Sequence, residues 1–173
     1  MNQSVKTLNE LSALDAEAEF LKCCGSSKWA SAMVGSRPFP NAPALFDKAD
    51  ALFGLLSDED WLEAFRAHPK IGEKKAATAQ SDTARKWSAQ EQAKTAQAGA
   101  DVMTGLAEGN REYEQRFGFI FIVCATGKTA EEILADLNQR LRNSPETELR
   151  NAAEEQRKIT RLRLEKLLQT AGA

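Results

Sequence analysis

Apolar side chains recur every three or four residues along most of this chain, which is the spacing of one face of an α-helix. In one stretch, for example, Leu45, Ala49, Leu52 and Leu56 share a face. With glycines and prolines as boundaries, this spacing predicts helices over residues 14–25, 26–35, 42–56, 57–68, 88–115, 129–142 and 144–168. A chain patterned in this way is expected to fold as an all-α, multi-helix bundle.

Start signals support several of these helices. Patterns of Ser or Thr followed three residues later by an acid, which are typical of helix N-caps, begin at Ser57, Ser88 and Thr129. Ser144 followed by Pro145 is the start expected for the last helix. Residues 73–86 are polar and aperiodic, which predicts a loop before Ser88, and three glycines are expected to bend or break the helix that follows.

The most apolar segment is "FGFIFIVCA", residues 117–125. Its periodicity fits a buried strand or the start of a buried helix equally well. No other segment reads as a strand that could pair with it, so the segment is expected to be a short buried connector between helices.

Composition limits the classes of protein to which this chain can belong. The chain has 173 residues, 42% hydrophobic and 28% charged, which is typical of a single soluble globular domain, 1–173. Its net charge of -2 argues against nucleic-acid binding. There is no apolar run of about 20 residues for a membrane span. The first residues do not resemble a signal peptide, nor the last ones a peroxisomal signal, so a cytoplasmic protein is expected.

The three cysteines are Cys23, Cys24 and Cys124. An odd count with two adjacent members predicts no disulfide framework, and one histidine with this pair does not supply a zinc site. Ordinary reduced thiols and no metal are therefore expected. A catalytic thiolate at Cys124, partnered by His68, is the minor alternative.

His68 is the only histidine in the chain, and Pro69 follows it directly. Because proline disfavours helical geometry in the preceding residue, the helix is expected to end at His68. The histidine is then either structural, with its cation at the negative end of the helix dipole, or catalytic. Pro69 stiffens the backbone and Gly72 permits a sharp turn, and both favour a fixed ring.

Glu91 and Gln92 are two further candidates for a functional site, and Glu91 could instead cap a helix. Glu91 either bonds back to the backbone of Ser88 as part of a capping box or orients an imidazole or a polar ring. Gln92 adds an amide with two donors and an acceptor.

Two arginines lie at the apolar stripe of their helices. Arg140 is seven residues after Ile133, and Arg163 is four after Ile159, so both are expected to point inward. A buried guanidinium needs an anionic partner. That partner is either an internal carboxylate, such as Glu148 or Glu131, or a substrate.

Five segments in order carry a family resemblance: "CCGSSKWASAMVGSRPF", "AFRAHPKIG", "WSAQEQA", "FGFIFIVCATGKTAEEIL" and "RLRNSPETELRNAAEEQRKITRLRL". Together they resemble the 2-oxo-4-hydroxy-4-carboxy-5-ureidoimidazoline (OHCU) decarboxylases of urate degradation. The resemblance implies an all-helical enzyme without a cofactor, often a homodimer, that removes the carboxylate of OHCU and yields (S)-allantoin.

The resemblance also implies site residues. It makes His68 the catalytic histidine and Pro69 a substrate contact. Glu91 falls on the family's second substrate-binding motif, and we predict that it is catalytic together with His68. The other residues implied to bind substrate are Ser88, Gln92, Phe121, Ile122, Val123, Cys124, Ala125 and Arg163. Arg140 is added from its helical spacing, and Lys70 stands where many members have arginine. The alternative class is a helical interaction module without chemistry, which would expose an apolar groove.

Overall fold

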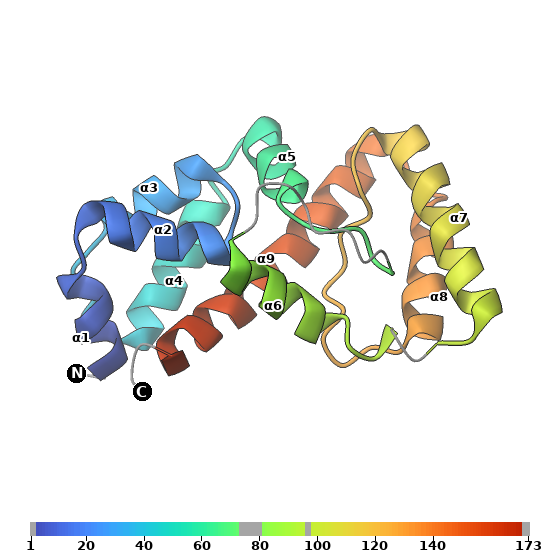
Figure 1. Ribbon diagram of the computed structural model, residues 1–173. Coiled ribbons are helices and arrows are strands. Elements are labelled where there is room, and N and C mark those ends of the chain that lie inside the picture. Colours follow the sequence, from blue (N-terminus) through green and yellow to red (C-terminus); the bar gives the residue numbers. More distant parts are fainter. Residues whose placement is uncertain (1–2, 73–80, 96–97, 171–173) are drawn as a thin grey trace. The chain divides into compact units, whose positions relative to one another are not determined.

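The computed structural model describes residues 3–72, 81–95 and 98–170. Over these ranges the chain forms nine α-helices and no strand, which confirms the predicted all-α class (Figure 1). The helices are α1 (Gln3–Glu10), α2 (Ala13–Cys23), α3 (Ser27–Gly35), α4 (Ala42–Phe53), α5 (Asp58–Arg66), α6 (Asp82–Glu91), α7 (Ala100–Phe117), α8 (Ala130–Arg140) and α9 (Pro145–Thr170).

Most of the predicted helices are confirmed to within a few residues. The capping box at Thr129 is present, because its side chain accepts the Glu132 N–H and the Glu132 carboxylate accepts the Thr129 N–H. Ser144 likewise accepts the N–H of Thr147 at 3.3 Å. Helix α1 was not predicted, since its buried stripe is only three residues long, Ser4, Val5 and Leu8.

The prediction around Ser88 is wrong. The loop predicted before Ser88 covers residues 73–86, and residues 73–80 lie outside the described part of the chain. Within the rest of that range, α6 already begins at Asp82, with Ser81 as its N-cap. Ser88 lies inside α6, and the helix ends at Glu91 instead of starting there. Helix α7 begins only at Ala100, after Gly99. The buried stripe of α6 is Ala84, Trp87 and Ser88, too short and too polar for its periodicity to show.

Contacts divide the chain into two compact units. The terminal unit comprises Met1–Ala64 and Arg157–Ala173, and the central unit comprises Phe65–Gln156. The expectation of one domain over 1–173 stays a prediction. In the terminal unit, Phe20 packs edge-on against Trp29 with ring centroids 5.9 Å apart, and the Trp29 indole donates to Ala49 O. No helix in the described part of the chain is long and apolar enough to cross a membrane.

The core of the central unit lies between α7, α8 and the connector, which we define as residues 118–125. Close approach of α7 to α8 depends on Gly109, where a Cβ atom would lie 2.6 Å from Leu137 Cδ2. The connector is not helical and pairs with no strand, while four of its side chains are buried: Phe121, Ile122, Val123 and Ala125. This confirms the prediction of a short buried apolar connector.

Candidate functional site

The turn after α5 fixes the backbone around His68. Helix α5 ends at Arg66, and the His68 N–H donates to Phe65 O at 3.0 Å, so the helix breaks where Pro69 predicted. Gly72 has φ +79°, a conformation that favours glycine. The carbonyl of Ile71 accepts a hydrogen bond from the buried side chain of Asn110 at 3.0 Å. We call residues 68–72 the histidine turn.

The imidazole of His68 is half-buried and has a partner on α9. Its Nε2 lies 2.7 Å from Oε1 of Gln156, whose side chain is fully buried. Gln156 is seven residues before Arg163, so helical spacing places it on the same inward face of the last helix. That spacing could not show that this amide meets a histidine 88 residues earlier in the chain.

The predicted Ser88–Gln92 motif contacts the histidine turn through Gln92. Gly72 N–H donates to Oε1 of Gln92 at 3.3 Å. Ser88 is buried, and Glu91 is half-buried at the last position of α6. The capping explanation of Glu91 is therefore wrong, because Ser88 lies inside α6 and Glu91 is the last residue of that helix.

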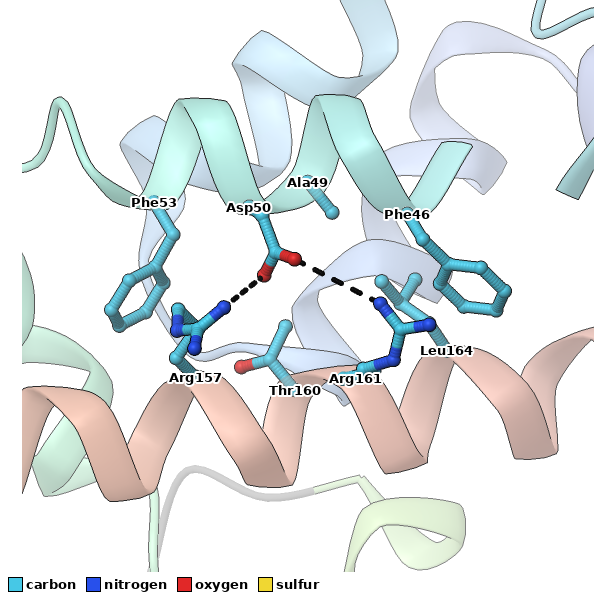
Figure 2. Close-up of a pocket in the computed structure, with 8 residues that line it drawn as sticks. All are labelled: Phe46, Ala49, Asp50, Phe53, Arg157, Thr160, Arg161 and Leu164. Carbon is cyan, nitrogen blue, oxygen red and sulfur yellow. Dashed lines mark hydrogen bonds and ion pairs between the residues drawn. The ribbon is translucent and has the colours of Figure 1, made fainter. Parts of the chain in front are cut away.

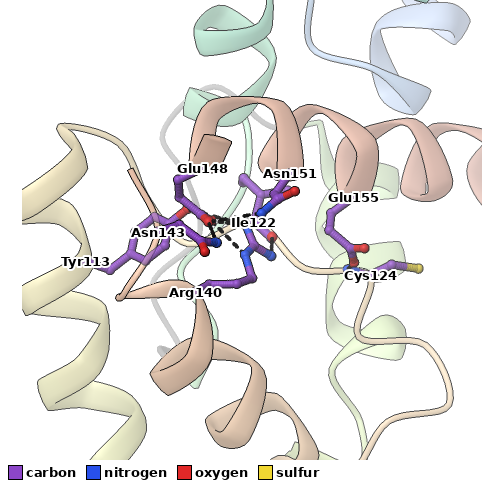
Figure 3. Close-up of polar contacts among 8 residues, drawn as sticks. All are labelled: Tyr113, Ile122, Cys124, Arg140, Asn143, Glu148, Asn151 and Glu155. Carbon is purple, nitrogen blue, oxygen red and sulfur yellow. Dashed lines mark hydrogen bonds and ion pairs between the residues drawn. The ribbon is translucent and has the colours of Figure 1, made fainter. Parts of the chain in front are cut away.

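The backbone of the connector is bound by side chains from two helices. Arg140 Nη1 donates to Ile122 O at 2.7 Å, and Cys124 N–H donates to Glu155 Oε2 at 2.7 Å (Figure 3). An extended segment without a neighbouring strand must satisfy its buried N–H and C=O groups in this way. Glu155 directly precedes Gln156, so adjacent residues of α9 bind the connector and His68.

Arg140 belongs to a buried polar cluster centred on Glu148, which is fully buried (Figure 3). The Arg140 guanidinium donates to Glu148 Oε1 through Nε at 2.7 Å and lies 4.6 Å over the Phe121 ring. Other groups that donate to Glu148 come from Tyr113, Asn143 and Asn151. The internal carboxylate predicted as a possible partner for Arg140 is therefore present, and it is Glu148. Burial raises the pKa of Tyr113 well above its ordinary value, against the influence of the Arg140 cation.

Arg163 lies in the terminal unit and is 3% exposed, which confirms that it points inward. Its Nη1 donates to Lys22 O at 3.4 Å, in the last turn of α2.

Burial raises the pKa of Cys24 to about 11, and the Arg163 cation is among the influences that oppose this rise. Burial likewise raises the pKa of Cys23 well above its ordinary value. All three cysteines are free thiols, as predicted.

The structure thus links the predicted residues of the central unit through three sets of hydrogen bonds. They join His68 to Gln156, the histidine turn to Gln92, and the connector to Arg140 and Glu155. Pro69 lies in the turn itself. Gln156, Glu155 and Asn110 were not among the predicted site residues, because only tertiary contact distinguishes them from other polar residues on helix faces. Among the described residues, no three His, Cys, Asp or Glu side chains are grouped so as to hold a metal.

A separate small hollow lies in the terminal unit, between α4 and the C-terminal part of α9 (Figure 2). There Asp50 points between two arginines, 3.1 Å from Arg157 Nη1 and 3.8 Å from Arg161 Nη1. Arg161 also lies 4.6 Å over the ring of Phe46. None of the predicted site residues lines this hollow.

Comparison with known proteins assigns the family. The model of the family described as OHCU decarboxylase matches residues 9–165, so the chain belongs to that family. It is 43% identical over 151 residues to the uric acid degradation bifunctional protein TTL of Arabidopsis thaliana, covering 87% of this chain and 47% of that protein. It is 30% identical over 168 residues to a uric acid degradation bifunctional protein of a Bacillus species, covering 94% and 32%. The chain thus spans less than half the length of each.

A solved structure is also similar. The crystal structure of an OHCU decarboxylase in the presence of (S)-allantoin matches with a TM-score of 0.76 and 39% identity, covering 87% of this chain and 97% of that one.

Proposed function

We propose that this chain decarboxylates OHCU to (S)-allantoin in urate degradation. Membership of the family and the solved relative with (S)-allantoin support the reaction and its product. The observation that carries the proposal for this chain is the meeting of three motifs. Gln156 binds His68, the neighbouring Glu155 binds the connector, and Gln92 binds the histidine turn.

The chemistry requires a protein to do three things. It must hold the substrate, allow the bond between the ring carbon and the carboxylate to break, and deliver a proton. When carbon dioxide leaves, the bonding electron pair is taken up by the neighbouring unsaturated ring atoms as an enolate-like anion. A proton added to one face of the ring then sets the S configuration. Preorganised donors around the ring stabilise the developing charge.

The proposed roles follow from position. His68 acts as general acid–base, a role worth about two to four orders of magnitude in rate. Glu91 and Gln92 bind the ureido and ring nitrogens. Buried connector side chains, such as Phe121 and Val123, exclude water from the ring. Pro69 and Ser88 are proposed as further contacts, and Arg163 stays a prediction from the family resemblance.

The Cys124 N–H and the Arg140 guanidinium were predicted to bind the substrate, but we propose a different role for them. The Cys124 N–H is directed at Glu155, and the Arg140 guanidinium at Glu148 and Ile122 O. We therefore propose that these groups hold the connector in position and that other atoms of the connector, at Ile122 and Ala125 among them, contact the substrate.

The experiment generates OHCU from urate with the two preceding enzymes and follows its loss and the chirality of the allantoin formed. Spontaneous decay without protein is the background. We expect His68→Ala to lower the rate above background about 10²- to 10⁴-fold, while its melting temperature stays close to that of the wild type. A His68→Ala variant that forms (S)-allantoin as fast as the wild type would show that the proposed role is wrong.

Glu91 has its own test because its carboxylate does not cap the start of a helix. We expect Glu91→Gln to lose activity and to fold normally. The matched control is Gln90→Ala, which changes an exposed neighbour on the same helix and should leave activity unchanged. Equal activity of Glu91→Gln and the control would remove Glu91 from the catalytic set.

The thiol alternative is tested with the same assay. It requires Cys124, so Cys124→Ser would be inactive if thiol chemistry operated, and we expect it to remain active. We also propose a homodimer, as the family resemblance implies. Light scattering on the purified chain measures the assembly.

A further inference from the structure

Gln156 faces the histidine on which the proposed function depends. We infer that Gln156 is a positioning residue, which holds neutral His68 as the tautomer with its proton on Nε2 and so makes Nδ1 the basic nitrogen of the site. The inference rests on the proposed function and deepens it, because it names the ring nitrogen that exchanges a proton with the substrate.

The contact itself sets the tautomer. The atom of Gln156 nearest the ring is its amide oxygen, 2.7 Å from Nε2, and a carbonyl oxygen can only accept a hydrogen bond. Nε2 must therefore donate. A neutral imidazole carries one ring proton, so Nδ1 keeps the lone pair that takes up a proton.

The surroundings of Gln156 make it a rigid support. The residue is fully buried and lies well inside α9, so its backbone cannot shift without disturbing the helix. On the other side, the His68 N–H is bound to Phe65 O, and the ring of Pro69 restricts the next backbone bond. His68 is thus held at its backbone and at Nε2.

The chemical type of the partner is also informative. A carboxylate at this place would favour the charged imidazolium. The carboxylate next in sequence, Glu155, instead accepts the Cys124 N–H. A neutral amide at Nε2 orients the ring without itself adding a negative charge.

The single histidine makes a direct test possible, because tag-free protein labelled with ¹⁵N-histidine gives one set of ring signals. At a pH where the ring is neutral, we expect a protonated Nε2 and an unprotonated Nδ1. Gln156→Leu should give a mixture of tautomers, and Gln156→Glu, which keeps an acceptor, should restore the Nε2–H form. Gln169→Leu, on the exposed face of the same helix, is the control and should not change the signals.

Kinetics complete the test. We expect Gln156→Leu to lower kcat about tenfold or more with little change in KM, a part of what general acid–base catalysis supplies. An Nδ1–H tautomer in the wild type overturns the inference, and so does an unchanged kcat in a folded Gln156→Leu protein. If Gln156→Leu does not fold, the tautomers seen in the spectra of the wild type and of Gln156→Glu decide whether the inference holds. Full activity of His68→Ala would instead refute the proposed function, whatever tautomer the spectra show.

Discussion

The two parts of helix α9 bury different kinds of side chain. In the central unit, its buried face includes the polar residues Glu148 and Gln156 together with alanines. In the terminal unit, the buried face carries large aliphatic side chains, Ile159, Leu164, Leu167 and Leu168, along with Thr160 and Arg163. One continuous helix of 26 residues therefore serves two purposes along its length.

The difference follows from what each part packs against. Helices satisfy their own backbone groups, so a helix packed on helices can bury an apolar face. The connector and the histidine turn are irregular, and their buried N–H and C=O groups need partners from elsewhere. In α9, the side chains that contact these irregular segments are Glu155, which accepts the Cys124 N–H, and Gln156, which contacts the His68 ring.

The largest effect is expected at Glu148. Glu148→Leu leaves the Arg140 guanidinium buried without its carboxylate, which typically costs about 3–5 kcal/mol of unfolding free energy. Urea unfolding measures it. Glu146→Leu, which removes an exposed ion pair with Arg150 on the same helix, should cost at most about 1 kcal/mol. Equal losses in the two variants would contradict a special role for buried polar groups in the central unit.

Leu164 tests the apolar part of the helix. Its side chain is 1% exposed, so Leu164→Ala should cost about 2–5 kcal/mol through lost burial and the cavity left behind. Thermal unfolding gives the size of the effect. The control Leu14→Ala changes a leucine that is 77% exposed and should stay within about 0.5 kcal/mol. A small loss at Leu164 would show that packing here is loose.

Glu155 tests the attachment of the connector. Removing the acceptor leaves the Cys124 N–H in need of a partner, so Glu155→Ala should cost about 1–3 kcal/mol. Hydrogen exchange of that amide should accelerate while amides in the middle of α7 keep their protection. The neighbouring Glu154 is exposed, and Glu154→Ala should leave the exchange of Cys124 unchanged. Unchanged exchange in Glu155→Ala would rule out this attachment.

The smallest effect is expected at Asp50, between Arg157 and Arg161 on the surface of the terminal unit. These three side chains are 36–49% exposed, so Asp50→Asn should cost about 0–1 kcal/mol, less at high salt. Unfolding at low and high ionic strength measures it. A loss comparable to that of Glu148→Leu would remove the contrast between exposed and buried ion pairs.

Local signals predicted much of the fold. The break at His68 follows from Pro69, and the start of α8 from its capping box, because both depend on residues within one helical turn. The connector was predictable from its apolar run and the lack of a second strand. Around Ser88 the same reasoning failed, since a Ser-x-x-Glu pattern fits the interior of a helix as well as its start, and Ser81 provides the actual cap.

The sequence by itself determined the helical class, the positions of most helices, the inward direction of Arg140 and Arg163, and the family resemblance. These are properties of periodicity and of motif order. Only the tertiary structure decided that Gln156 meets His68, that Glu155 and Arg140 bind the connector, and that Glu148 pairs with Arg140. These partners are 8 to 88 positions apart in the chain. Their hydrogen bonds depend on how the helices pack, and no local pattern encodes which polar groups will face each other.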